Sequence, residues 1–296
     1  MADPLSAACA PAPGPTPHSL VWRRIRRNRL SFGALCVIGL IALAAIFAPW
    51  VAPYLPDATD AASALQAPTW RHPLGTDLYG RDQLSRIIFA ARIDLAVAFG
   101  ATAAAVALGA LLGAAIGYRG GWADHIAMRA VDATMAFPAF VLAMGITAAL
   151  GNSTINVAIA IAITQVPGYL RLIRGEMLRV RELEYADAAR TVGNPAWRIV
   201  FIHLLPNCMP PLIVQATLAM GFALLTMAAL SFIGLGIQPP QSEWGVMTAE
   251  GANHMVTGEW WLFLFPGMAI MIAVLAFNLV GDGLRDFLDP RMRGIR

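Results

Sequence analysis

The sequence contains no lysine, and all 21 of its basic residues are arginine. A Walker A loop needs a lysine that reaches the β- and γ-phosphates of ATP, so this polypeptide cannot form that ATP site. Enzymes that depend on a lysine Schiff base or a lysine general base are excluded for the same reason. If the protein uses ATP, another chain must hydrolyse it.

Charged residues of either sign are scarce. They make up 13% of the 296 residues, whereas 58% are hydrophobic and the mean hydropathy is +0.62. Soluble globular proteins carry roughly a quarter charged residues. The composition therefore predicts an all-α polytopic membrane protein.

Cysteine is also rare, and the three that occur lie far apart at positions 9, 36 and 208. This spacing supports neither a disulfide framework nor a metal-binding knuckle. The net charge of +3 and the pI near 9.0 would suggest nucleic acid in a soluble chain, but arginine gathered on one membrane face explains both. No basic patch is interleaved with aromatic residues, so we expect no nucleic-acid partner.

Motifs for catalysis or metal binding are missing as well. There is no His-Glu-x-x-His sequence, Ser231 has no neighbouring base, and the five histidines are scattered along the chain. We therefore expect no catalytic residues, no metal and no cofactor.

Long apolar runs indicate how often the chain crosses the membrane, since a spanning helix needs roughly 20 apolar residues. Candidate runs cover residues 32–54, 93–118, 126–150, 154–170, 209–232 and 261–284. The fourth run is the shortest, and Pro167 and Gly168 interrupt its end. The sequence predicts about six transmembrane helices.

The distribution of arginine sets the expected orientation, because positive residues accumulate in cytoplasmic loops. A cluster of five arginines lies within residues 23–29, and counting spans places the loop 171–198 and the tail 291–296 on the same side. Both termini are therefore predicted to be cytoplasmic. The segment 55–92 conflicts with the rule, because it is predicted to lie outside yet carries four arginines.

These observations divide the chain into five regions. The first run exceeds the length of a signal-peptide core, so we interpret it as an uncleaved span. We expect a disordered cytoplasmic N-terminus at 1–20, a first transmembrane helix with its basic flank at 21–54, an outer polar segment at 55–92, a core transmembrane domain at 93–284 and a cytoplasmic tail at 285–296.

Three glycines in the second apolar run recur at intervals of four. Gly109, Gly113 and Gly117 fall on one face of a helix, where missing side chains allow a second helix to approach closely. This pattern predicts tight helix packing and carries no information about substrate.

Two further local features lead to structural expectations. Asp132 lies in the third apolar run, three positions after Arg129, and we expect an ion pair between them near the membrane interface. Arg81 and Asp82 are expected to begin a short helix that ends near Arg92.

The longest polar connection between two apolar runs contains a short helical pattern. Asp187 lies early among good helix formers, Ala188 and Ala189 offer a flat surface, and Gly193 suits the end of a helix. Pro206 suits the start of the next helix. From spacing alone, a docking element for a soluble partner and a solvated connector remain equally open.

Several motifs together resemble one family. Asp187-Ala188-Ala189, Gly193 and the Leu-Leu-Pro at 204–206 are similar to the EAA signature of ABC importer permeases, with aspartate in place of glutamate and His203 where isoleucine is frequent. Residues 72–86, 231–245 and 276–290 resemble the second inner-membrane permease of dipeptide, oligopeptide and nickel importers. Asp94 departs from this pattern, in which serine is usual.

The resemblance implies a type I importer fold and a non-catalytic bacterial inner-membrane subunit that forms half of a translocation pathway. Its partners would be a homologous permease, two ATPase subunits, an extracytoplasmic binding protein and membrane lipid. The residues implied in coupling to the ATPase are Glu184, Tyr185, Asp187, Ala188, Ala189, Arg190 and Gly193.

Peptides are the leading substrate class that the resemblance implies, while glutathione, nickel chelates and opine-like compounds remain open. A stand-alone channel or secondary transporter is the rival class. The apolar runs disfavour it, because they offer almost no carboxylates for a proton relay. A stand-alone intramembrane enzyme ranks third.

Overall fold

The computed structural model describes residues 29–288, so the predictions for 1–20, for the arginines before Arg29 and for the tail beyond 288 lie outside the described residues. The described chain is built from helices, with one isolated bridge between Thr76 and Asp82. The all-α fold class is confirmed. The helices are α2 (Arg29–Ile46), α3 (Ala48–Val51), η1 (Ala61–Ser63), α4 (Gln83–Arg119), α5 (Gly121–Met135), α6 (Ala139–Leu150), α7 (Thr154–Val180), α8 (Glu184–Thr191), α9 (Ala196–Arg198), η2 (Ile199–Leu204, a π-helix), α10 (Leu205–Phe232), α11 (Trp244–Ala252) and α12 (Trp261–Leu288).

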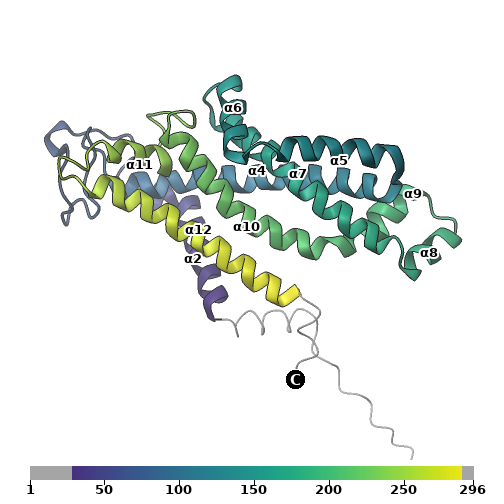
Figure 1. The fold of residues 1–296 in the computed structure, drawn as a ribbon. Coiled ribbons are helices and arrows are strands. Elements are labelled where there is room, and N and C mark those ends of the chain that lie inside the picture. Colours follow the sequence, from purple (N-terminus) through teal and green to yellow (C-terminus); the bar gives the residue numbers. More distant parts are fainter. Residues whose placement is uncertain (1–28, 289–296) are drawn as a thin grey trace, which may run out of the picture.

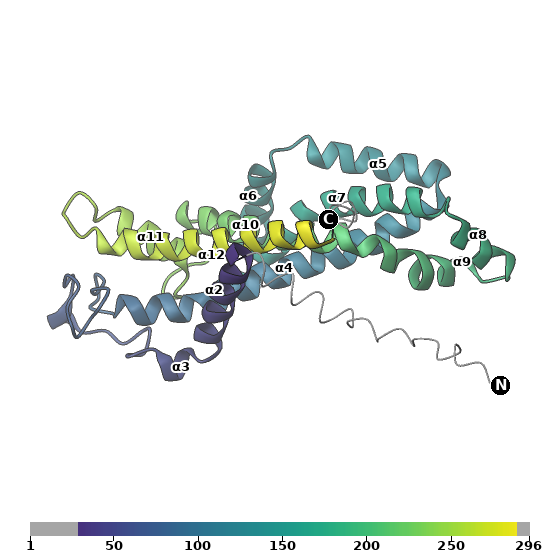
Figure 2. The same cartoon turned by 90° about the horizontal axis from the view of Figure 1, so that it is seen from below.

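Four long helices, α4, α7, α10 and α12, run along the length of the molecule (Figures 1 and 2). The pair α4 and α7 shares the most extensive packing, α10 contacts both of them, and α12 packs on α10 and α2. The short helix α8 lies at one extremity, which we name the α8 end. The opposite extremity holds α11 together with residues 52–82, and we name it the α11 end.

Five of the helices are long and apolar enough to cross a membrane, and a sixth span results if α5 and α6 are counted as one. The predicted number of about six is therefore confirmed. The third predicted run, 126–150, is not straight, because α5 and α6 meet at 89°. Pro138 precedes α6, and a proline disfavours helical backbone at the residue before it.

Two expected interruptions are absent from the described helices. Pro167 does not end α7, which continues for 27 residues. Neighbouring helices and local adjustments can satisfy the backbone groups that proline frees in a membrane helix. The expected short helix ending near Arg92 is also wrong, because α4 runs unbroken from Gln83 to Arg119, with Asp82 accepting a 2.8 Å hydrogen bond from the Ser85 N–H at its start.

The expected ion pair between Arg129 and Asp132 does not form. Asp132 on α5 instead accepts a hydrogen bond from Arg171 on α7. Further along the same two helices, Arg174 donates to both carboxylate oxygens of Asp124, with 2.6 Å between Nη2 and Oδ2. Sequence spacing favoured a partner within α5, but the fold brings α7 alongside it, so two ion pairs fasten α5 to α7.

The three glycines of α4 lie directly against α7. A Cβ atom added at Gly109 would lie 2.5 Å from Tyr169 Cβ, and one at Gly113 would lie 2.6 Å from the Leu170 carbonyl oxygen. At Gly117 the corresponding distance to Met177 Cβ is 2.9 Å. Real Cβ atoms do not approach neighbours this closely, so glycine sets how near the two backbones come.

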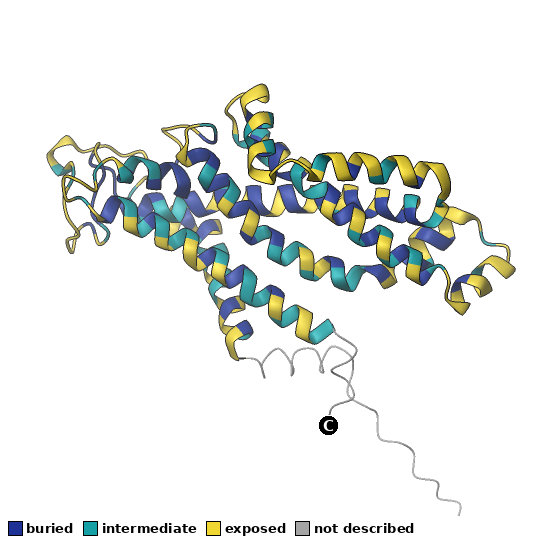
Figure 3. Ribbon diagram, viewed as in Figure 1, coloured by how far each residue is buried: buried dark blue, intermediate teal, exposed yellow. Residues whose placement is uncertain are grey.

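Burial follows the same arrangement (Figure 3). Buried residues gather between the long helices and around α11, whereas α5, α6 and α8 are largely exposed on the described surface. The segment 52–82 is fixed to the start of α12, because Trp261 Nε1 donates to the Thr76 carbonyl at 3.3 Å and Gln83 Nε2 donates to the Leu262 carbonyl at 3.3 Å.

Replacement of Gly113 by alanine tests the α4–α7 contact. We expect Gly113→Ala to lower the stability of the purified protein by about 1–3 kcal/mol, because the new methyl overpacks against the Leu170 backbone. The thermal unfolding midpoint in detergent measures the change. Gly100→Ala in the same helix is the matched control, since nothing lies within 4 Å of a Cβ there, and an equal loss in both variants would contradict this packing.

Candidate functional site

The polar loop of the sequence analysis forms α8, which projects from the end of the molecule between α7 and η2 (Figure 1). Leu183 immediately precedes the helix, and its carbonyl accepts a 2.8 Å hydrogen bond from the Ala186 N–H. Glu184 and Asp187 lie in the first turn, where negative side chains stabilise a helix. Gly193 follows the last turn with a φ of +82°, a conformation that favours glycine.

One side of α8 packs against the rest of the chain, chiefly against η2. Ala186 is fully buried in the hydrophobic core, and Ala189 is partly buried against it. Ala188 is exposed. The sequence predicts that Ala188 and Ala189 share one flat surface, but the helix turns only Ala188 outward, and Ala186 is the residue that anchors α8.

Arginine side chains tie α8 to the ends of α4 and α7. Arg190 Nη1 donates to Asp187 Oδ1 at 2.6 Å, and its Nη2 donates to the Arg181 carbonyl at 3.0 Å. The Arg190 guanidinium also lies 5.7 Å from the ring centroid of Tyr118. A hydrogen bond with Tyr118 raises the pKa of Arg190. Arg181 Nη1 in turn donates to the Gly117 carbonyl at 2.9 Å, so α8 is fixed to the carboxyl end of α4.

Tyr185 lies on α8, and burial raises the pKa of its hydroxyl. Asn207, near the start of α10, donates to the His203 carbonyl of η2 at 2.7 Å. Pro206 lies in the first turn of α10, as the sequence predicted. α8 is therefore tied to the ends of α4 and α7 through polar side chains, and it packs on η2, which continues into α10.

The outward side of α8 has nothing over it among the described residues. Glu184, Asp187 and Ala188 are exposed there. Just beyond the helix, Val192 is 82% exposed and Trp197 is 61% exposed. These two apolar residues are not among those that the sequence predicts for coupling, although a valine and a tryptophan within a polar connection are a usable signal of an exposed apolar surface.

The outward side of α8 exposes acidic side chains, with apolar side chains just beyond the helix. Its acidic residues are not gathered into a metal site: across residues 29–288 there is no group of three or more histidine, cysteine, aspartate or glutamate side chains that could hold a metal ion. Arg181 links α8 to the packing glycines. Its guanidinium donates to the Gly117 carbonyl, and its own carbonyl accepts a hydrogen bond from Arg190 of α8.

Comparison with known proteins identifies the family. The model for the inner membrane component of binding-protein-dependent transport systems matches residues 105–294. The chain belongs to this family. A second model, for the N-terminal transmembrane domain of oligopeptide transport permease C, matches residues 16–68.

Curated relatives cover nearly the whole permease. A putative peptide transport system permease of Brucella abortus is 43% identical over 99% of this chain and 98% of its own length. The probable D,D-dipeptide transport system permease of Escherichia coli is 44% identical over 93% of this chain and 92% of its own. A glutathione transport system permease of Pectobacterium atrosepticum is 40% identical over 94% and 92%.

The family and the helices agree on the nature of the protein. It is a multi-pass inner-membrane permease subunit with the type I ABC importer permease fold. α8, η2 and the three glycines all fall within the matched region 105–294.

A pair of leucine substitutions separates the two sides of α8. We expect Ala186→Leu to lower stability by about 1–3 kcal/mol, because its pocket in the core is already filled. Ala188→Leu should change stability by less than about 0.5 kcal/mol, since the residue is exposed. Thermal unfolding midpoints of the purified permease in detergent measure both, and equal losses would show that α8 does not pack as described.

Proposed function

We propose that this permease is one of two homologous subunits that form the pathway of an ABC importer, and that α8 docks on an ATPase subunit. The observation that carries the proposal is the construction of α8. This helix projects at the end of the molecule, is tied to α4 and α7, packs on η2, and keeps an uncovered side with Val192 and Trp197 exposed.

The charge distribution supports a cytoplasmic α8 end. The arginines of α7 and its following loop cluster towards α8, as the positive-inside rule expects for the cytoplasmic side. At the α11 end, two of the four arginines that conflicted with the rule are buried and paired: Arg81 Nε and Arg86 Nη1 each lie 2.6 Å from Asp77 Oδ2. A guanidinium neutralised inside the fold no longer acts as an exposed positive charge.

Tight packing explains how a movement of α8 would be transmitted to the membrane-spanning helices. α8 cannot move independently of α4 and α7, because Arg181 and Arg190 hold it to their ends. The glycine contacts keep α4 and α7 together, and the ion pairs of Asp124 and Asp132 carry α5 with them. Closure of the ATPases would therefore rotate these helices as one body between inward- and outward-facing states.

Relatives support peptides as the substrate class. The Brucella and Escherichia coli proteins are named as peptide and D,D-dipeptide permeases, and glutathione permeases are almost as similar. Glutathione is itself peptide-like, so both ligands fit one class of pathway. We propose di- or oligopeptides as substrates, delivered by an extracytoplasmic binding protein.

The test is ATP hydrolysis by the complete importer in lipid nanodiscs. With the binding protein present, a dipeptide should stimulate hydrolysis at least as strongly as glutathione. Ala188→Leu combined with Asp187→Arg should abolish this stimulation and prevent the ATPase subunits from co-purifying, because bulk and reversed charge are placed on the docking side.

The matched control for this experiment is the same pair of changes at an exposed position of the α11 end, Ala58→Leu with Asp57→Arg. That control should keep the ATPase subunits bound. Normal co-purification and normal stimulation in the α8 double variant would contradict the proposal and would mean that α8 is only a solvated connector.

A further inference from the structure

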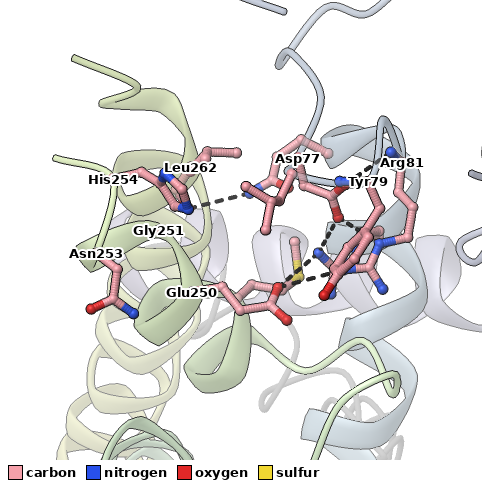
Figure 4. A pocket seen from close by; sticks show the side chains of 12 residues that line it. Asp77, Tyr79, Arg81, Glu250, Gly251, Asn253, His254 and Leu262 are labelled. Carbon is pink, nitrogen blue, oxygen red and sulfur yellow. Dashed lines mark hydrogen bonds and ion pairs between the residues drawn. The ribbon is translucent and has the colours of Figure 1, made fainter. Parts of the chain in front are cut away.

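A cavity at the α11 end is lined by charged side chains from two separate parts of the chain (Figure 4). Residues 77–86, at the start of α4 and just before it, form one wall. Residues 247–254, in α11 and the turn after it, form the other. The cavity measures about 160 Å³ and opens to the surface.

Two arginines in this cavity are almost completely buried. Arg81 is 4% exposed and Arg86 is 1% exposed. Both donate to Asp77 Oδ2 at 2.6 Å, and Arg86 Nη1 also lies 3.0 Å from Glu250 Oε2. Two carboxylates thus balance two guanidinium groups, which makes the burial of these charges possible.

Each of the two buried arginines has one nitrogen without a hydrogen-bond acceptor in the described part of the chain. Nη2 of Arg81 and Nη2 of Arg86 are buried without a hydrogen-bond partner among residues 29–288. Arg81 Nη2 lies 3.7 Å from Glu250 Oε2, which is close enough for an ion pair but beyond hydrogen-bond length. Buried donors without an acceptor are rare and costly, and here two arginines of one cavity wall each carry such a donor.

Glu250 is the exposed member of the cluster. Its side chain is 32% exposed, whereas those of Arg81, Arg86 and Asp77 are at most 6% exposed. Glu250 lies on α11 at the mouth of the cavity and can turn towards solvent by a change of rotamer. Asp77 cannot, because its Oδ1 also accepts hydrogen bonds from the Tyr79 and Arg81 N–H groups at 2.9 Å.

The donors specify the chemistry of an incoming group. Guanidinium groups bind carboxylates through paired, charge-assisted hydrogen bonds. The cavity admits the end of one acidic side chain, while sites that enclose a small-molecule ligand measure about 300 Å³ or more. Size therefore favours a side chain presented by a protein over a whole peptide substrate.

The surroundings of the cavity are those of a protein interface. Leu78 and Tyr79 on one side are 47% and 55% exposed, and Met255 and Val256 beyond α11 are 51% and 96% exposed. Interfaces concentrate their binding energy where arginine and aromatic side chains lie within an apolar surround.

We propose that this cavity receives an aspartate or glutamate side chain of the extracytoplasmic binding protein, which takes the place of Glu250 on Arg81 and Arg86. The proposal rests on the proposed function, because it needs the α11 end to face outward. Glu250 occupies the arginines while the binding protein is absent and is released when it docks.

Neutralising Glu250 tests this exchange. Glu250→Gln keeps the shape of the side chain but weakens its hold on Arg86 and removes its repulsion of an incoming carboxylate. We expect the peptide-free binding protein to bind the complete importer in nanodiscs about 3- to 10-fold more tightly, measured by surface plasmon resonance. A merely structural ion pair predicts unchanged or weaker binding, and either result would overturn the proposal.

Glu259→Gln is the matched control, because it removes the same charge from the turn after α11, where Glu259 accepts a hydrogen bond from Thr257. Glu259→Gln should leave the affinity for the binding protein unchanged. If both variants gained affinity equally, the effect would come from surface charge alone, which would contradict the exchange. Arg81→Gln provides the opposite variant and should weaken docking about 10-fold or more.

Failure of the exchange can be distinguished from failure of the proposed function. If Glu250→Gln changes only the peptide concentration needed for half-maximal transport, and not docking, the cavity binds the carboxylate of the substrate and the exchange is wrong. If the wild-type importer shows no stimulation by any binding protein, the proposed function fails, whatever the variants do.

Discussion

The close approach of α4 and α7 is the constraint on which the rest of the described structure depends. It exists because Gly109, Gly113 and Gly117 leave no side chain between the two backbones. Once these helices are fixed, Arg171 and Arg174 of α7 meet the carboxylates of α5, and Arg181 reaches the end of α4. The position of α8 follows from this pair, so helix packing between α4 and α7 determines where the exposed side of α8 lies.

Arginine is paired differently at the two ends of the molecule. This difference reduces the conflict between segment 55–92 and the positive-inside rule from four arginines to two, since only Arg71 and Arg92 are exposed. At the α8 end, several arginines make local or surface contacts, such as Arg179 with Glu176 at 2.6 Å. At the α11 end, Arg81 and Arg86 are buried against Asp77 and Glu250. The rule concerns exposed charge near the membrane, and a sequence count cannot distinguish an exposed arginine from a buried, neutralised one.

Much of this architecture could be predicted from the sequence, because its signals are local. Long apolar runs indicated the spans, glycines four apart marked the α4–α7 face, and Gly193 and Pro206 marked helix ends. Other features depend on what the fold brings together. The bend between α5 and α6, the partner of Asp132, the burial of Ala186 and the pairing of Arg86 with Glu250, 164 residues apart, all require knowing which helices are neighbours.

Site-specific photo-crosslinking would show most directly whether the α8 end meets the ATPase while the α11 end faces away from it. A photoreactive amino acid would replace Val192, which is 82% exposed beside α8, or Trp70, which is fully exposed at the α11 end. In the assembled importer, we predict crosslinks to the ATPase subunit from position 192 and none from position 70. Crosslinks to the ATPase from position 70, or none from position 192, would mean that the two ends are assigned wrongly.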